Sequence, residues 1–189
     1  MESRENWYNE RNDRSLRYAG RVLPTDRPIL LRLPEEFATS HDHQAAMIVA
    51  ANLLSRMAPE IDLGHEGIAY LLGLTNGIST VVVGAIRPES HTTIGSFSVS
   101  SVAMARVVRA ASNAGLQVVG QIHTHPRAAF HSDGDDDGAR IAYDGYISIV
   151  VPNYGRDLPS FRGAAVYFYR NNNFSPLGAK SLKIIDGAF

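Results

Sequence analysis

The sequence predicts an α/β sandwich in which a central mixed β-sheet is flanked by helices. Short apolar runs bounded by turn residues alternate with two longer segments that read as helices, and this mixture predicts both kinds of element. About 44% of the 189 residues are hydrophobic, which is sufficient for a single core. The predicted order is β-α-β-β-α-β, then a loop with a short helical turn, then two further strands.

Bulk composition excludes several classes of protein. The formal net charge of −1 and the pI near 6.6 argue against a general nucleic-acid binder and against a protein of anionic membrane surfaces. The chain has no cysteine, which excludes disulfides, thiolate metal sites and a cysteine nucleophile. Any metal ion must therefore be held by His, Asp or Glu.

The N-terminal segment differs in composition from the rest of the chain. Residues 1–21 mix charges with Asn and Tyr and show no apolar period, so we expect a polar arm. Residues 22–189 are expected to form a single domain. The polar start lacks the apolar stretch of a secretory signal, and no apolar run is long enough to span a membrane. The sequence thus predicts a cytoplasmic protein without a membrane partner.

The first half of the domain is predicted to contain one helix and three strands. A short strand over residues 28–33 stops at a proline, and residues 43–57, rich in Ala, Met and Leu, favour a helix. Residues 68–74 and 80–86 are compact apolar runs. The intervening Thr75-Asn76-Gly77 is a hairpin signal, so these two runs are predicted to be adjacent antiparallel strands.

The second half is predicted to contain a helix and three strands. Residues 98–114 favour a helix, and Gly115 stands where a left-handed C-terminal cap is wanted. Residues 116–124 and 164–169 favour core strands. Residues 146–151 form a β-branched run that ends at a turn, which is typical of a buried strand. The tail after the last strand matches no clear pattern.

The strand ending in His123-Thr124-His125 carries the clearest chemical signal. Residues two apart in a strand point to the same face, so His123 and His125 can converge on one ion while Thr124 faces the other way. Pro126 ends the strand because it cannot donate to the ladder. Two imidazoles and one carboxylate leave a fourth position for water, which is the open arrangement of a catalytic zinc site.

A capped acidic turn follows the two histidines. Ser132-Asp133-Gly134-Asp135 has the pattern of a helix start with Ser132 as the N-cap, so Asp135 can point back toward the histidines. Taken singly, a His-x-His pair is more often incidental and an acidic run is usually a solvated loop. The apolar strand, the histidine pair, the proline and the capped turn together favour a metal site.

These residues resemble a known motif. His123-Thr124-His125-Pro126 and Ser132-x-x-Asp135 are similar to the JAMM motif of the MPN (JAB-domain) zinc metalloproteases. The family pattern includes an upstream glutamate seven residues before a glycine, and Glu66 and Gly73 match that spacing. The resemblance covers roughly residues 30–169 and is closest to the bacterial branch. It implies the MPN (cytidine-deaminase-like) sandwich fold and a Zn²⁺ cofactor.

The motif leaves the third zinc ligand open between two aspartates. The family spacing from the second histidine points to Asp136, with Asp133 in the position of the serine. The Ser-x-x-Asp unit points to Asp135 and requires a loop that is one residue shorter. We favour Asp135, because a change in loop length costs little, whereas the register between cap and ligand within a helical turn is constrained.

The resemblance also implies an activity. Glu66 would act as general base for attack of zinc-bound water on an amide, and Ser132 would donate a hydrogen bond to the developing oxyanion. Family substrates are amide bonds after the C-terminal glycine of a ubiquitin-like protein or its conjugate. Bacterial relatives act in ubiquitin-like conjugation, including antiphage systems, beside E1/E2-like proteins. The segments 80–86, as an edge strand, and 87–97 are candidates for the substrate groove.

Two alternative functions remain open on the sequence. The first is a non-catalytic MPN scaffold that binds partners, although the chain retains every motif residue. The second is a zinc hydrolase of another substrate class on the same fold; the near-neutral charge argues against a nucleic-acid substrate.

Overall fold

A computed structural model describes residues 44–49, 60–77, 79–132, 134–135, 141, 143–177 and 181–186. The elements within these ranges are β1 (Gln44–Val49), β2 (Ile68–Thr75), β3 (Ser79–Ile86), β4 (Ser90–Thr92), β5 (Phe97–Val99), α3 (Ser101–Asn113), β6 (Gln117–Thr124), β7 (Ile147–Val151), η2 (Asn153–Gly155), β8 (Ala165–Arg170), β9 (Asn173–Pro176) and β10 (Leu182–Asp186). The N-terminal arm, its boundary at residue 22 and the predicted strand at 28–33 lie outside the described residues.

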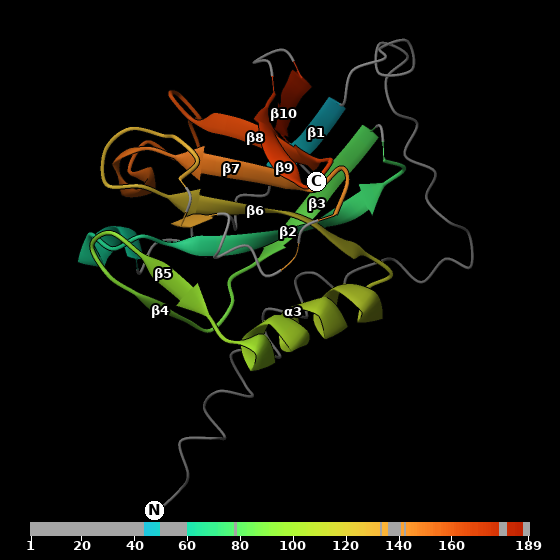
Figure 1. Cartoon of the computed structure of the whole chain (residues 1–189), viewed down its shortest axis with the longest axis horizontal. Helices are drawn as coiled ribbons and strands as arrows, with labels where there is room; N and C mark the ends of the chain where they lie inside the picture. The colour runs from blue at the N-terminus through green and yellow to red at the C-terminus, as the bar shows by residue number, and fades with distance from the viewer. Residues whose placement is uncertain are drawn as a thin grey trace, which may run out of the picture.

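Eight strands form one mixed sheet in the order β10-β1-β3-β2-β6-β7-β8-β9 (Figure 1). β2 is antiparallel to both β3 and β6, whereas β6 and β7 run parallel. The predicted central mixed sheet is therefore confirmed, as is the antiparallel pair β2–β3. Gly77 in their connecting turn has φ 84°, the left-handed conformation that glycine tolerates best. β4 and β5 form a separate hairpin beside the sheet.

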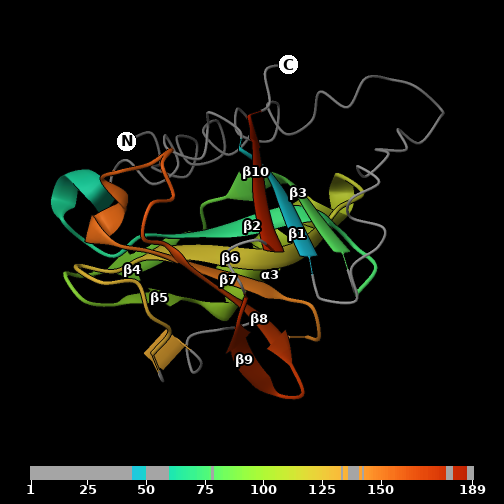
Figure 2. The same cartoon turned by 90° about the horizontal axis from the view of Figure 1, so that it is seen from above.

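The predicted helix over residues 43–57 is wrong in the part that the structure describes. Gln44–Val49 is strand β1, which lies between β3 and β10 and runs parallel to both. Figure 2 shows β1 and β10 side by side. Helix propensity is a weak preference that tertiary pairing overrides, and the pairing partner here comes from the far end of the chain. Residues 50–59 lie outside the described ranges.

The position of β1 also corrects the expected substrate groove. Residues 79–82 of β3 pair with β1 on one side, and β3 pairs with β2 on the other. This part of β3 is therefore inside the sheet and cannot accept an added strand there, because its backbone groups already have partners.

Helix α3 begins three residues later than predicted, because Phe97–Val99 belongs to strand β5. The hydroxyl of Ser100 accepts a hydrogen bond from Ala103 N at 3.1 Å and so caps the first turn. At the other end Gly115 has φ 68°, and Leu116 N donates to Ala111 O at 2.9 Å. This confirms the predicted left-handed cap.

The sheet has a buried cluster on each face. α3 lies on one side of the sheet (Figure 1) and buries Ala103, Met104 and Val107 against Ile68, Tyr70 and Leu72 of β2. The other cluster contains Ala69, Leu71, Ile122, Ile149 and Leu158. Alternate residues of β2 thus serve opposite faces, as a strand buried on both sides requires. Within the described ranges, no helix has the length and apolar character needed to cross a membrane.

Candidate metal centre

The two histidines of the motif lie where β6 ends. His123 is fully buried and pairs with Ile68 of β2, so it faces the α3 side of the sheet. His125 follows the last residue of β6, and its N–H donates to Val151 O of β7 at 2.9 Å. The two imidazole centroids are 5.1 Å apart. The central strands therefore place both rings on one side, as the period of a strand predicts.

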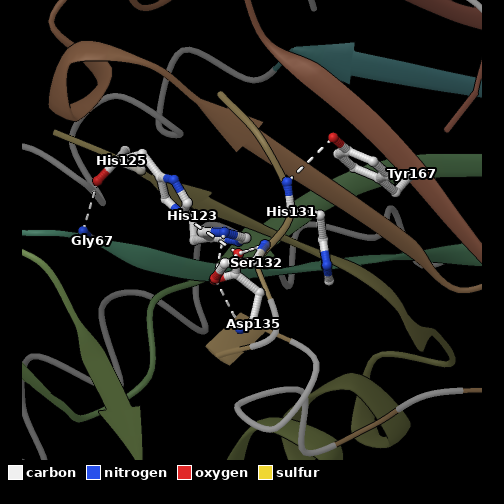
Figure 3. A network of polar contacts seen from close by, with 8 residues as sticks. Gly67, His123, His125, His131, Ser132, Asp135 and Tyr167 are labelled. Atoms are coloured by element: carbon white, nitrogen blue, oxygen red, sulfur yellow. Dashed lines mark hydrogen bonds and ion pairs between the residues drawn. The ribbon is translucent and has the colours of Figure 1, made fainter. Parts of the chain in front are cut away.

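The turn after the histidines places Asp135 against both rings (Figure 3). Asp135 N contacts Ser132 Oγ at 3.3 Å, which supports the predicted N-cap. In return, Ser132 N–H and Ser132 Oγ–H donate to Asp135 Oδ2 at 2.7 Å and 2.9 Å. This reciprocal arrangement is a capping box with Asp in place of the usual Glu, and it orients the carboxylate.

His123, His125 and Asp135 together have the geometry of a metal site. One ligand atom from each residue lies within 4.8 Å of the other two. Asp135 Oδ1 is 3.1 Å from His123 Nε2, and Asp135 Oδ2 is 3.5 Å from His125 Nε2. Two ligands about 2.0–2.1 Å from a tetrahedral zinc ion are roughly 3.3 Å apart, so these spacings suit a shared ion.

The ring nitrogens of His123 support this interpretation. Both are buried, and neither has a hydrogen-bond partner within the described residues. His123 Nε2 therefore lies 3.1 Å from the Asp135 carboxylate without being aligned for a hydrogen bond. Buried polar atoms are normally paired, so the Nε2 atom facing a carboxylate is explained by an ion between them. The residues present thus fit a metal ion.

The alternative third ligand, Asp136, lies outside the described residues. The structure brings Asp135 to both histidines, with one ligand atom of each residue within 4.8 Å of the others. The assignment of Asp135 as ligand stays a prediction, which the paired variants described below test.

Glu66 faces the same centre from the segment before β2. It is 6% exposed, and its backbone N–H donates to Thr93 O at 2.8 Å. The neighbouring His65 Nδ1 lies 3.2 Å from Thr92 Oγ1. The segment is therefore attached to the β4–β5 hairpin and leads directly into β2.

These side chains share one cavity of about 540 Å³. It is lined by Glu66, His125, Ser132 and Asp135. Residues 95–97 from the β4–β5 hairpin form one wall, and residues 126–128 with Phe130 form the other. The cavity thus places a carboxylate, a metal-binding group and a hydroxyl together in a concave site, which is the usual setting of an active site.

Burial and charge set the protonation of the candidate ligands. Burial lowers the pKa of His123, against the pull of the Asp135 carboxylate, and favours the neutral imidazole that binds metal. Burial also lowers the pKa of His125, but contact with Asp135 and the charge of Glu66 outweigh it and raise that pKa. For Asp135, burial opposes ionisation, yet the two imidazoles and the Ser132 N–H hold its pKa well below the usual range.

The Glu66 carboxyl predicts how activity should depend on pH. Burial raises its pKa from 4.5 to about 7, and the charge of His125 opposes the increase. A general base must be ionised to accept a proton, so kcat/KM should rise with pH and level off above the pKa. A bound cation lowers the pKa of Glu66, so the rise of kcat/KM with pH should be centred at or below about pH 7. A profile that falls with rising pH, or that stays flat down to the lowest pH at which the metal content is constant, would contradict this role.

A strained turn holds the two walls of the cavity. Asn153 and Tyr154 have φ 55° and 56°, which non-glycine residues rarely adopt. Tyr154 N–H donates to His125 O at 2.8 Å, and Asn153 N–H donates to Arg127 O at 3.1 Å. The Tyr154 hydroxyl donates to Ile94 O of the hairpin at 2.9 Å. The strain therefore occurs where one turn contacts both walls.

The remaining histidines have other places. The His131 ring packs on Phe174 with centroids 4.4 Å apart, and its backbone N–H donates to the Tyr167 hydroxyl at 3.2 Å. It thus helps to attach the loop before Ser132 to β8 and β9. His41 and His43 lie outside the described residues.

Several residues around the site carried no signal in the sequence. Phe97 and Phe130 line the cavity walls, and Tyr154 and Tyr167 hold its loops, but isolated aromatic residues have no diagnostic spacing. Of these four residues, only Tyr154 lies in a segment that the sequence predicted, because it stands in the turn after β7.

Comparisons with known proteins agree with this architecture. The family of prokaryotic homologs of the JAB domain matches residues 50–162. A protein of Sinorhizobium fredii named "Probable metalloprotease y4jG" is 32% identical over 108 residues, covering 55% of this chain and 67% of that protein. The solution structure of protein DSY2949 from Desulfitobacterium hafniense aligns with a TM-score of 0.55 at 13% identity, over 76% of this chain and 94% of that one. The chain therefore belongs to the prokaryotic homologs of the JAB domain.

Proposed function

We propose that this protein is a zinc metallopeptidase that hydrolyses the amide bond after the C-terminal glycine of a ubiquitin-like protein. The observation that carries the hydrolytic part is that the buried carboxyl of Glu66 shares one cavity with His125 and Asp135, which form a metal-binding group with the buried His123. The likeness to a probable metalloprotease supports the same reaction class. Two imidazoles and one carboxylate are a ligand set that zinc prefers.

Zinc, when bound, supplies Lewis acidity and acidifies water at its open position. Glu66 accepts the proton of the attacking water, because its buried carboxylate lines the same cavity as His125 and Asp135. The same carboxyl then returns that proton to the departing amine nitrogen. One residue thus handles both proton transfers, and the chain needs no covalent nucleophile.

Ser132 has two tasks in this proposal. Its hydroxyl donates to Asp135 Oδ2 and orients that carboxylate in the resting protein. The Ser132 backbone N–H donates to the same oxygen at 2.7 Å, so the carboxylate keeps a donor when the hydroxyl turns to the substrate. The hydroxyl can then donate to the oxyanion that develops on the amide carbonyl, a contact typically worth a few kcal/mol.

The ubiquitin-like substrate rests on the family resemblance, and the cavity is compatible with it. Phe97 and Phe130 both line the cavity, and a chain without side chains fits most easily beside such bulky groups. A Gly-Gly tail has this property. The partners proposed for this protein, E1/E2-like proteins, would then belong to the same conjugation pathway.

Cleavage of a defined fusion tests the proposal. A ubiquitin-like protein joined through its C-terminal glycine to a reporter should be cut after that glycine by zinc-loaded protein, with one zinc ion per chain. His125→Ala should lose both the zinc and the cleavage, because it removes one of the ligands. A fusion with Ala-Ala at the tail is the matched substrate control.

Each failure has a distinct meaning. Stoichiometric zinc with cleavage of other amides, but of no ubiquitin-like fusion, would reject the substrate and keep the chemistry. Protein that binds no zinc and cleaves nothing would reject the hydrolase and favour a binding scaffold.

A further inference from the structure

The Glu66 side chain is held in place indirectly. Within the described part of the chain, its carboxylate makes no hydrogen bond, and Glu66 lies in the segment between the helical turn 60–63 and β2. Its position therefore depends on the backbone of Glu66 and Gly67. Three hydrogen bonds hold that backbone: one joins Glu66 N–H to Thr93 O, and the other two join Gly67 to Thr124.

Thr124 stands between the two candidate ligands His123 and His125. Its side chain faces the opposite side of the sheet and is 1% exposed. The Thr124 hydroxyl oxygen accepts a hydrogen bond from Gly67 N–H at 2.8 Å, while Thr124 N–H donates to Gly67 O at 3.0 Å. In Figure 3 the amide nitrogen of Gly67 points to this contact beside His125.

This contact departs from an ordinary strand ladder. Opposed residues of a hydrogen-bonded antiparallel pair exchange two backbone bonds. Between Gly67 and Thr124 only one backbone bond forms, and the threonine hydroxyl accepts the second N–H in place of a carbonyl. The side chain thereby holds the chain where it enters β2, one residue from Glu66.

We propose that Thr124 is a positioning residue, whose hydroxyl holds the Gly67 amide and so fixes Glu66 relative to the metal-ligand strand. The strand that carries the ligands would then also set the place of the general base. The proposal rests on the proposed function for its effect on catalysis, whereas its structural part concerns the Gly67 amide alone.

Replacement of the hydroxyl by a methyl group tests this. Thr124→Val has nearly the same shape but leaves the buried Gly67 N–H without an acceptor. In zinc-loaded protein, amide exchange at Gly67 should become about tenfold faster, because the local hydrogen bond is lost. kcat on the fusion substrate should fall by about 10- to 100-fold with KM within about threefold, because the base is displaced while binding groups remain. Zinc content should not change.

Two further variants separate the hydroxyl from the packing. Thr124→Ser keeps the hydroxyl and should restore both the exchange rate and most of kcat. Thr80→Val on β3 removes another buried threonine hydroxyl, which donates to Thr75 Oγ1 at 2.8 Å. This variant should leave kcat and the amide exchange rate at Gly67 unchanged. If Thr124→Val does not fold, Thr124→Ala takes its place.

The following outcomes would overturn the inference. They are unchanged exchange at Gly67 in Thr124→Val, kcat within about twofold of wild type in that variant, or equal defects in Thr124→Ser and Thr124→Val. The last would show that the hydroxyl alone does not account for the effect. If wild-type protein cleaves no amide, the proposed function fails, and exchange at Gly67 still decides the structural role of Thr124.

Discussion

Glu66→Gln should lower kcat by about 10²- to 10⁴-fold while the protein still binds one zinc ion per chain. A positioned general base contributes about this factor, and glutamine cannot accept the proton. Glutamine has the same shape as glutamate, and Glu66 does not belong to the metal-binding group. The variant should therefore keep its zinc ion. Single-turnover cleavage and metal analysis of the same sample measure both effects.

Glu89→Gln is the matched control. Glu89 is exposed and pairs with Arg106 on the surface at 3.0 Å, so its neutralisation should change kcat by less than about twofold. Full activity of Glu66→Gln would refute its assigned role. Loss of zinc from that variant would show instead that Glu66 contributes to the metal site.

Asp135→Ala should weaken zinc binding by more than about 100-fold and abolish cleavage. Loss of residues that merely orient a ligand already costs 10- to 100-fold in affinity, and a direct ligand costs more. Asp135 Oδ1 and Oδ2 each face a histidine nitrogen at 3.1 Å and 3.5 Å, so its removal leaves two imidazoles without their anionic partner. Competition with a chromophoric chelator measures the affinity.

Asp136→Ala separates the two candidate aspartates. It removes an equal charge one residue away, so a difference between the variants reports on the ligand and not on net charge. If Asp135 is the ligand, Asp136→Ala should bind zinc within about threefold of wild type. The reverse result would assign the ligand to Asp136 and show that the loop keeps the usual family length.

Local patterns in the sequence predicted the parts of the site that lie close along the chain. The strand period placed His123 and His125 on one side, and the Ser-x-x-Asp pattern predicted the capped turn that contains Asp135. Both follow from backbone geometry within a few residues. Glu66 carries no such local signal. Its nearness to the histidines arises from the pairing of β2 with β6, and only the family resemblance indicated it.

Two elements were missed, one that depends on distant pairing and one that is a local hairpin. Residues 44–49 have a helix-like composition, yet their partners β3 and β10 make them a strand. The hairpin β8–β9 was missed although Asn171 and Asn172 both adopt positive φ, 51° and 59°, a pair typical of a tight hairpin turn. That signal was present in the sequence. The hydroxyl contact of Thr124 with Gly67 was not predictable, since it joins residues 57 positions apart.

The pairing of β1 with β10 has a consequence for the order of folding. β10 follows all the other strands that the structure describes, so its parallel pair with β1 cannot form until residues 182–186 have been synthesised. Pairs that close such long loops form slowly, because the loss of chain entropy precedes the gain in contacts. Glu66, His123, His125 and Asp135 lie on or beside β2 and β6. These two strands are central in the sheet, and both precede β10 along the chain. The metal centre can therefore assemble on the nascent chain before the far edge of the sheet closes.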